Sequence, residues 1–164
     1  MVKHTLAALL WLLLFITGCK PLIATYDEYS YTQLSSVKVD VLNVIDKSTE
    51  DYTTHAAEVA DVLTETHKAM EYDIHKPKNE IMAKMWSVMD GLLTDTTALI
   101  PNQPKSHLKG LLASWKKEGH FSGKTFVNEA KQQIGEGFDL LMELESRKIH
   151  DNDERITSFI AKNQ

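Results

Sequence analysis

The sequence predicts an all-α fold, a compact antiparallel bundle of four to five helices. Apolar residues recur three and four positions apart along most of the chain, which places them on one face of a helix. Prolines and glycines interrupt this spacing at a few points, where the connections between helices are expected. No stretch alternates convincingly between apolar and polar residues as a half-buried strand does. The apolar faces must bury against each other, and a bundle is the simplest arrangement that does so.

The first helix is predicted over residues 26–47 and the second from Tyr52 to a point before Pro77. The first has its apolar stripe at Leu34, Val37, Val41, Val44 and Ile45. The second has its stripe at Tyr52, Ala56, Val59, Leu63 and Met70. Residues 49–51 form a local break, and one long bent helix through residues 48–49 is the alternative.

A third helix is predicted over residues 77–99 and a short fourth helix over 105–117. Pro77 suits the first turn of a helix, where its missing N–H has no intrahelical partner to lose. Pro101 and Pro104 end the third helix. The inward faces comprise Ile81, Met82, Met85, Trp86, Met89, Leu92 and Leu93, then Leu108, Leu111, Leu112 and Trp115.

The last predicted helix begins near Lys124, after a loop at residues 119–123. Its apolar face comprises Phe126, Val127, Ala130, Ile134, Phe138, Leu141 and Leu144. Two readings stay open: the helix continues towards Ile160, or the polar residues 151–153 break it. The apolar residues beyond this point would either pack on the core or form an exposed docking segment.

Composition excludes several classes of protein. The chain has 164 residues with Lys+Arg 18 against Asp+Glu 23, and 43% of its residues are hydrophobic. The 7 glycines and 4 prolines are too few for a collagen-like or Pro/Gly-rich disordered chain, and one cysteine excludes a disulfide scaffold. A net charge of -5 makes nucleic acid an unsuitable partner, because phosphate binding needs clustered Lys and Arg.

The first nineteen residues have the pattern of an export signal. Lys3 precedes an uncharged apolar run over residues 5–16, which is shorter than the ~20 residues of a membrane-spanning helix. The run leads into Ile16-Thr17-Gly18-Cys19, with small residues before the cysteine. This segment resembles the lipobox of bacterial lipoproteins.

The resemblance implies a division of the chain. Residues 1–18 would be a signal peptide, cut between Gly18 and Cys19, and the Cys19 thiol would carry a covalent diacylglycerol. Residues 19–25 would be the lipidated cysteine and a short tether, and residues 26–164 a single helical domain. Two or three acyl chains bind a bilayer durably, whereas one is marginal.

The residue after the cysteine bears on localisation. Lys20 stands where, in Gram-negative lipoproteins, an Asp favours retention at the inner membrane. The resemblance therefore implies the periplasmic face of the outer membrane, or the outer face of the cytoplasmic membrane in a Gram-positive host.

The best candidate for a metal site is formed by His67, Glu71 and His75. Positions i, i+4 and i+8 lie roughly on one helix face, and two imidazoles with a carboxylate suit zinc. His55 or Asp73 would supply a fourth ligand. The alternative is a solvated histidine pair beside an ordinary glutamate.

Three further patterns have simpler interpretations. Residues 119–125 resemble a phosphate-binding loop that lacks one spacer residue, and a helix–helix loop is favoured. Gly135 and Gly137 interrupt a helix at a cost of ~1 kcal/mol each, which favours close packing of another element against them, with a flexible point or a partner contact as the alternative. The methionines near Trp86 are interpreted as core.

Tyr26, Tyr29 and Tyr31 cluster just after the tether. Tyrosine favours surfaces with one apolar and one wet side, so these residues are candidates for contact with a partner or with lipid headgroups. The alternative is that they cover the base of the bundle.

The leading hypothesis is a non-enzymatic, membrane-anchored interaction or assembly module that binds an envelope protein. It needs no cofactor beyond the lipid on Cys19. The second hypothesis is a periplasmic ligand- or metal-binding bundle, and a third is an exclusion or immunity lipoprotein against phage, plasmid or toxin.

Overall fold

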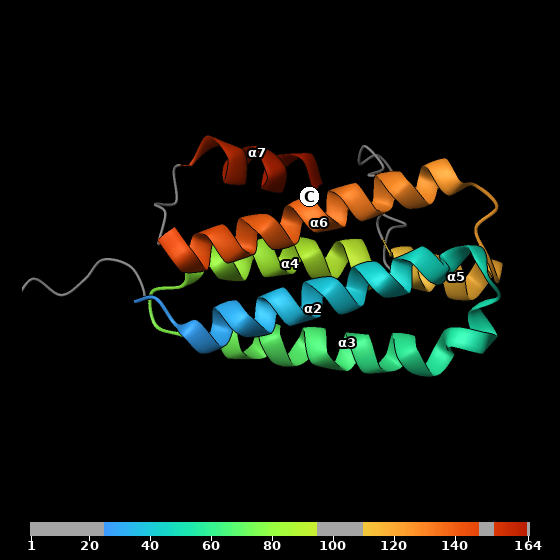
Figure 1. The fold of residues 1–164 in the computed structure, drawn as a ribbon. Helices are drawn as coiled ribbons and strands as arrows, with labels where there is room; N and C mark the ends of the chain where they lie inside the picture. Colours follow the sequence, from blue (N-terminus) through green and yellow to red (C-terminus); the bar gives the residue numbers. More distant parts are fainter. Residues whose placement is uncertain (1–24, 95–109, 148–152, 164) are drawn as a thin grey trace, which may run out of the picture.

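The structure is a computed structural model that describes residues 25–94, 110–147 and 153–163 (Figure 1). All regular structure in these ranges is helical, which confirms the all-α prediction. The elements are α2 (Glu28–Asp46), η1 (Lys47–Thr49), α3 (Tyr52–Ile74), α4 (Glu80–Thr94), α5 (Leu111–Glu118), α6 (Lys124–Arg147) and α7 (Glu154–Asn163). The described residues thus contain six α-helices, where four to five were expected.

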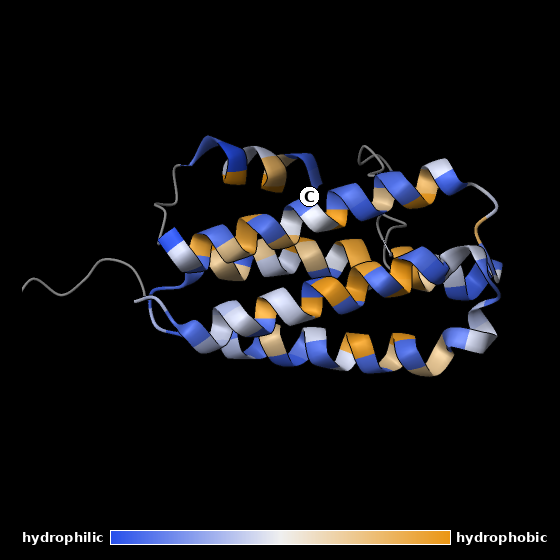
Figure 2. Ribbon diagram, viewed as in Figure 1, coloured by the Kyte–Doolittle hydropathy of each residue, from blue (hydrophilic) through white to orange (hydrophobic). Residues whose placement is uncertain are grey.

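Four of these helices form the body of the fold. In Figure 1, α2 and α4 run in one direction, and α3 and α6 run in the other. Helix α2 packs most extensively on α6 and α3, and α4 packs on both of these as well, so the four helices enclose one core. Helix α5 packs against α4 and α3, and α7 packs against α4. Figure 2 shows hydrophobic residues facing inward between the helices.

The first two helices are separate. Asp27 caps α2 by accepting hydrogen bonds from the backbone N–H groups of Tyr29 and Ser30. Asp51 caps α3 in the same way by accepting from Thr53. The 3₁₀ turn η1 lies between them, so the predicted break is present and the single bent helix is not formed.

The predicted start of the third helix is wrong. Helix α4 begins at Glu80, and Pro77 precedes it. Lys78 adopts a left-handed backbone conformation with φ 62°, which a continuous α-helix does not accommodate. The side chain of the buried Asn79 donates to the carbonyl oxygen of Asp73, which ties this connection to the end of α3. Residues 95–104, with the predicted stop at Pro101 and Pro104, lie outside the described residues.

The predicted fourth helix is shorter in the described part of the chain. Helix α5 spans Leu111–Glu118, while residues 105–109 lie outside the described residues. Gly119, with φ 83°, ends it in a conformation that favours glycine. Residues 119–123 form a helix–helix loop as favoured, and its Gly119 carbonyl accepts from Tyr52 at the start of α3.

The additional helix is α7, which is separate from α6. Asp153 caps it by accepting from the N–H of Arg155, and its own carbonyl accepts from Thr157. Ile156, Phe159 and Ile160 are buried, so α7 packs on the bundle rather than forming an exposed docking segment. Residues 148–152 lie outside the described residues.

The methionine interpretation is confirmed. Met82, Met85 and Met89 are at most 1% exposed and lie in the core with Trp86. Within the three described ranges, no helix combines the length and apolar character that crossing a membrane requires.

Candidate functional site

Cys19 and Gly18 lie outside the described residues, so the lipid attachment and cleavage sites stay predictions. The described chain begins at Thr25, immediately before α2. The start of α2 lies at the end of the bundle where α3 ends, α4 begins and α6 ends (Figure 1). Any anchor on Cys19 would therefore enter the domain at this end.

The structure groups the three predicted tyrosines at this end. Tyr26 and Tyr29 are 52% and 60% exposed, and Tyr31 is half-buried with its ring centroid 6.5 Å from that of Tyr26. Tyr72 of α3 joins them, with its ring centroid 4.9 Å from that of Tyr29. We call Tyr26, Tyr29, Tyr31 and Tyr72 the tyrosine end. Tyr72 was missed because nothing in the sequence pairs the end of α3 with the start of α2.

A hydrogen bond fixes the tyrosine end to the cap of α2. The Tyr72 hydroxyl donates to Asp27 Oδ2 at 2.6 Å. This bond lowers the pKa of Asp27, with further help from Ser30 N–H and Lys76, against the opposing effect of burial. It also raises the pKa of Tyr72, because a phenolate would face the Asp27 carboxylate.

A buried ionic cluster lies beneath the tyrosine end and consists of Asp27, Asp73, Lys76 and Glu145. Asp73 is 1% exposed and Glu145 is fully buried. Lys76 Nζ lies 3.2 Å from Asp73 Oδ1, 3.0 Å from Glu145 Oε2 and 3.6 Å from Asp27 Oδ2. Burial opposes the charge on Lys76, but the hydrogen bond to Glu145 and the two neighbouring carboxylates outweigh it and raise the Lys76 pKa.

Further hydrogen bonds connect this cluster to four helices. Asp73 accepts from the Ser30 hydroxyl of α2 and, at 2.9 Å, from the Trp86 indole N–H of α4. Glu145 of α6 accepts from the backbone N–H of Asp27 at 2.6 Å. The cluster thus joins the start of α2 to the ends of α3 and α6, and it holds the tyrosine end in place.

The pKa shifts of this region predict a stability window in pH. The Asp27 pKa is lowered from its ordinary value of 3.8, so its contribution to stability is present above that value and is lost as the pH falls through the folded pKa. The Lys76 pKa is raised from 10.5, so its contribution is present below 10.5 and is lost at higher pH.

The acid side of this window tests the role of Asp27. The Asp27→Asn variant keeps a capping side chain but has no carboxylate to protonate at this position. We therefore expect its melting temperature to fall less than that of the wild type when the pH is lowered from about 4 to about 2. Thermal melting followed by circular dichroism measures the difference. Parallel curves for the two proteins across this range would contradict the assignment.

The candidate metal ligands are only partly brought together. His75 Nδ1 lies 2.8 Å from the Glu71 carbonyl oxygen and 3.6 Å from its carboxylate. His67 instead faces α4, with Nε2 at 3.4 Å from Asp90 Oδ1. In the part of the chain that the structure describes, no group of three His, Cys, Asp or Glu side chains is arranged to hold a metal ion.

The suggested fourth ligands lie elsewhere. His55 lies between Glu50 and Glu58 at the other end of α3, where their hydrogen bonds and charges raise its pKa despite some desolvation. Asp73 is committed to the buried ionic cluster. The geometry of the described residues therefore gives the metal hypothesis no support.

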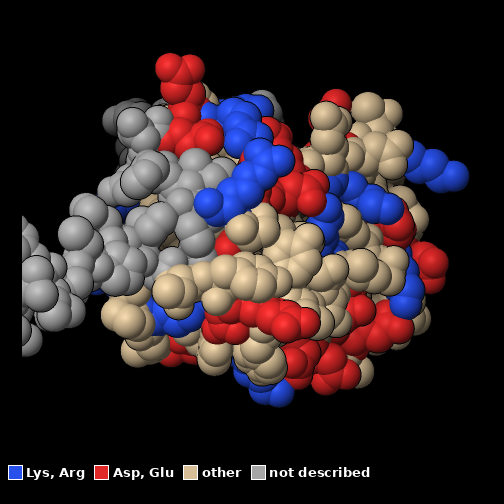
Figure 3. Space-filling view, turned by 60° about the vertical axis from the view of Figure 1, so that its left-hand side comes forward, with Lys and Arg blue, Asp and Glu red and all other residues tan. Residues whose placement is uncertain are grey.

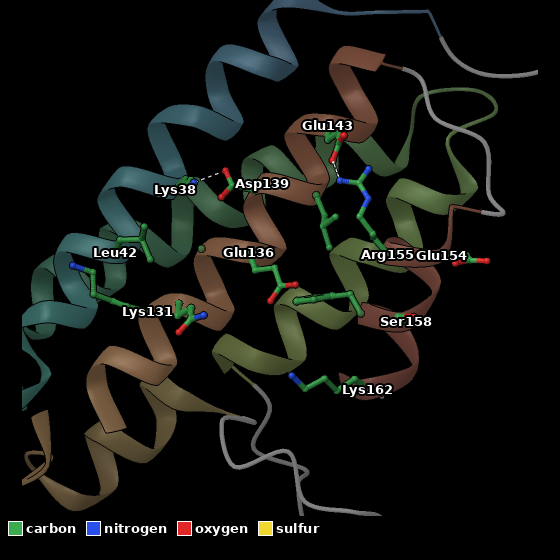
Figure 4. A pocket seen from close by; sticks show the side chains of 14 residues that line it. Lys38, Leu42, Lys131, Glu136, Asp139, Glu143, Glu154, Arg155, Ser158 and Lys162 are labelled. Atoms are coloured by element: carbon green, nitrogen blue, oxygen red, sulfur yellow. Dashed lines mark hydrogen bonds and ion pairs between the residues drawn. The ribbon is translucent and has the colours of Figure 1, made fainter. Parts of the chain in front are cut away.

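A surface groove lies over α6, between α2 and α7, with a volume of about 950 Å³ (Figure 4). Its apolar lining comes from Leu42, Gly135, Leu140 and Phe159. Its charged lining comes from Lys38, Lys131, Glu136, Asp139, Glu143, Glu154, Arg155 and Lys162. We call it the α6 groove.

Ion pairs order part of the rim. Lys38 of α2 pairs with Asp139 of α6, and Arg155 of α7 pairs with Glu143 of α6 at 2.8 Å. Figure 4 shows both pairs as bridges from α6 to the flanking helices. An apolar strip between charges of both signs suits an amphipathic protein segment better than a small uniformly charged ligand.

The two helix-interior glycines have different surroundings. A Cβ atom at Gly137 would lie 2.1 Å from Met89 Sδ and 3.0 Å from Phe159 Cζ, which confirms close packing there. At Gly135 the nearest atom is Leu42 Cδ1 at 3.8 Å, an ordinary contact. Gly135 lines the α6 groove, so the favoured close packing is found at Gly137 and not at Gly135.

Comparisons with known proteins give no identification, since no protein-family model, curated protein or solved structure matches this chain.

Proposed function

We propose that this chain is a non-enzymatic interaction module of the bacterial envelope, held at a membrane through an acylated Cys19. In a Gram-negative host it would face the periplasm from the outer membrane, and in a Gram-positive host it would lie on the outer face of the cytoplasmic membrane. The lipobox-like segment Ile16-Thr17-Gly18-Cys19 supports the anchor.

The observation that carries the interaction part of the proposal is the α6 groove. Its apolar strip, from Leu42 across Gly135 to Phe159, is wide enough that three helices contribute to it. The charges on its rim belong to both signs, so an envelope protein could present an apolar side chain row flanked by complementary charges. The module would bind such a segment and keep its owner at the membrane.

Site-specific crosslinking in the native host tests the proposed partner. A photoreactive amino acid is placed at Gln132 or Ser158, which are exposed at the α6 groove, and at Ala57, which is exposed on α3 away from it. We expect one envelope protein to be captured from the two groove positions and not from Ala57, as identified by mass spectrometry. Equal capture from all three positions, or none from the groove, would overturn the groove as the binding surface.

The anchor has its own test. We expect Cys19→Ala to abolish incorporation of radiolabelled palmitate and to move the protein from the membrane fraction to the soluble fraction, because no acyl chains remain to be buried. Cys19→Ala should also lose the crosslinked partner if anchoring brings the two together. A variant that stays in the membrane fraction would refute the anchor.

A further inference from the structure

We infer that the tyrosine end is a docking surface for zwitterionic phospholipid headgroups, and that it orients the bundle on the membrane with the far end pointing away. The inference rests on the proposed acylation of Cys19. It adds a second, non-covalent contact with the bilayer and names the residues that make it: Tyr26, Tyr29, Tyr31 and Tyr72.

The length of the connection between Cys19 and the domain restricts which surface meets the lipid. Five residues, 20–24, separate Cys19 from Thr25, the first residue described. Six residue steps reach about 20 Å when fully extended. Helix α6 has 24 residues and is therefore about 36 Å long. The opposite end of the bundle lies about 36 Å from Thr25, which is farther than the tether can span. The tether therefore holds the surface near Thr25 closest to the membrane.

Exposed apolar surface concentrates at this end. Among the described residues, the large hydrophobic side chains that are exposed are Tyr26, Tyr29, Val39 and Tyr72. Three of these four belong to the tyrosine end, and four of the chain's five tyrosines lie there. Tyrosine combines an apolar ring with a polar hydroxyl, which suits the level of the headgroups.

The rings are held before any contact is made. Tyr29 packs edge-on against Tyr72, and Tyr72 is fixed by its hydrogen bond to Asp27. Asp27 is in turn held by Glu145 through its backbone N–H and by the nearby ammonium of Lys76. A surface that is already ordered loses little conformational entropy on docking.

The charges around the rings decide the kind of headgroup. Glu28 is exposed beside the tyrosines. The ammonium group of Lys76 lies 5.4 Å from the centroid of the Tyr72 ring while it pairs with the buried carboxylates. The exposed Lys68, close to Tyr29, pairs with Glu65 at 2.7 Å. Figure 3, which turns this end forward, shows uncharged residues across the middle, with basic and acidic residues above them and mainly acidic residues below. Charges of both signs around the rings complement the ammonium and phosphate groups of a zwitterionic headgroup such as phosphatidylethanolamine, so a zwitterionic surface fits.

A depth measurement on the acylated protein tests the inference. After acylation of Cys19 an introduced cysteine is the only free thiol, because the chain has one cysteine. Nitroxide labels are placed at Glu71→Cys, beside Tyr72 on α3, and at Lys117→Cys, exposed on α5 at the far end. The protein is reconstituted into vesicles of equimolar phosphatidylethanolamine and phosphatidylcholine. Collisions of each label with oxygen and with a water-soluble nickel complex are then compared.

We expect the rate of collisions with the nickel complex to be roughly fivefold lower for the label at position 71 than for the label at position 117, while collisions with oxygen persist at both. The reason is that docking at headgroup level places position 71 within ~5–10 Å of the interface. The label at Lys117 should stay fully accessible to nickel. Tyr26→Ser with Tyr29→Ser should restore nickel access at Glu71, whereas Tyr26→Phe with Tyr29→Phe, which keeps both rings, should not.

Each other outcome overturns the inference in a distinguishable way. Equal nickel access at Glu71 and Lys117, on a protein that mass spectrometry shows to be acylated, refutes the docking and leaves the anchor intact. Loss of both nickel and oxygen collisions at Glu71 indicates burial against protein instead of lipid. If Cys19 is unmodified and the protein does not bind vesicles, both the proposed anchor and the proposed docking are refuted.

Discussion

Replacing Lys76 with methionine is expected to lower the free energy of unfolding by about 3–5 kcal/mol, the effect of removing one partner from a buried ionic cluster. The loss leaves Asp73, 1% exposed, and the fully buried Glu145 without their shared ammonium group. Methionine retains most of the apolar stem of lysine, so the lost charge and hydrogen bonds account for most of the change. Chemical denaturation followed by circular dichroism near neutral pH measures it.

Lys68→Met is the matched control. Lys68 lies on α3, which ends just before Lys76, and it pairs with Glu65 at 2.7 Å, but both side chains are largely solvent-exposed. An exposed pair contributes at most about 1 kcal/mol. We also expect Glu145→Gln to recover part of the loss in the Lys76→Met background, because it removes one buried charge and keeps an oxygen that accepts from Asp27 N–H. If Lys76→Met costs no more than Lys68→Met, the cluster does not stabilise the fold as argued.

The second large effect is that replacing each of two glycines of α6 with alanine should change the stability of the protein in opposite directions. We expect Gly137→Ala to destabilise the protein by about 1–3 kcal/mol, because the new methyl group would overlap Met89 and press on Phe159. We expect Gly135→Ala to stabilise it by up to ~1 kcal/mol, because alanine favours the helix and its methyl group meets only Leu42 at ordinary contact distance.

Denaturation midpoints of the two variants measure this difference directly. Shortening Met89 in the Gly137→Ala background should recover part of the lost stability if the overlap with its sulfur is the cause, although the cavity left by a smaller side chain limits the recovery. Two glycine variants of equal stability would show that Met89 and Phe159 move aside without cost, and that close packing does not require glycine at 137.

Local sequence patterns predicted most helices well because each rests on residues within a few turns. The helical spacing of Val37, Val41 and Val44 places them on the buried face of α2 as expected. The start of α4 was predicted wrongly because Pro77 is compatible with a first helical turn, and the left-handed conformation of Lys78 has no local sequence signal. The separate α7 follows from the cap at Asp153, one of the two readings left open.

In the candidate site too, features that depend on neighbouring residues were predicted, and features that depend on tertiary contacts were not. Tyr26, Tyr29 and Tyr31 were recognised because they are close in sequence, and their clustering needs only one short segment. The contribution of Tyr72 depends on α3 returning to the start of α2, and the spacing that suggested a metal site for His67 and His75 could not show that His67 faces Asp90.

The sequence by itself determined the all-α class, the succession of amphipathic helices and the lipobox-like segment, because each is encoded in the spacing or order of neighbouring residues. Only the tertiary structure decided which charges are buried together and where a groove is left open. Asp73 and Glu145 are far apart in the chain and meet at one Lys76 ammonium because α3 and α6 end at the same end of the bundle. The α6 groove likewise exists because α2 and α7 flank α6 without closing the space over Gly135, an outcome of how whole helices fit together.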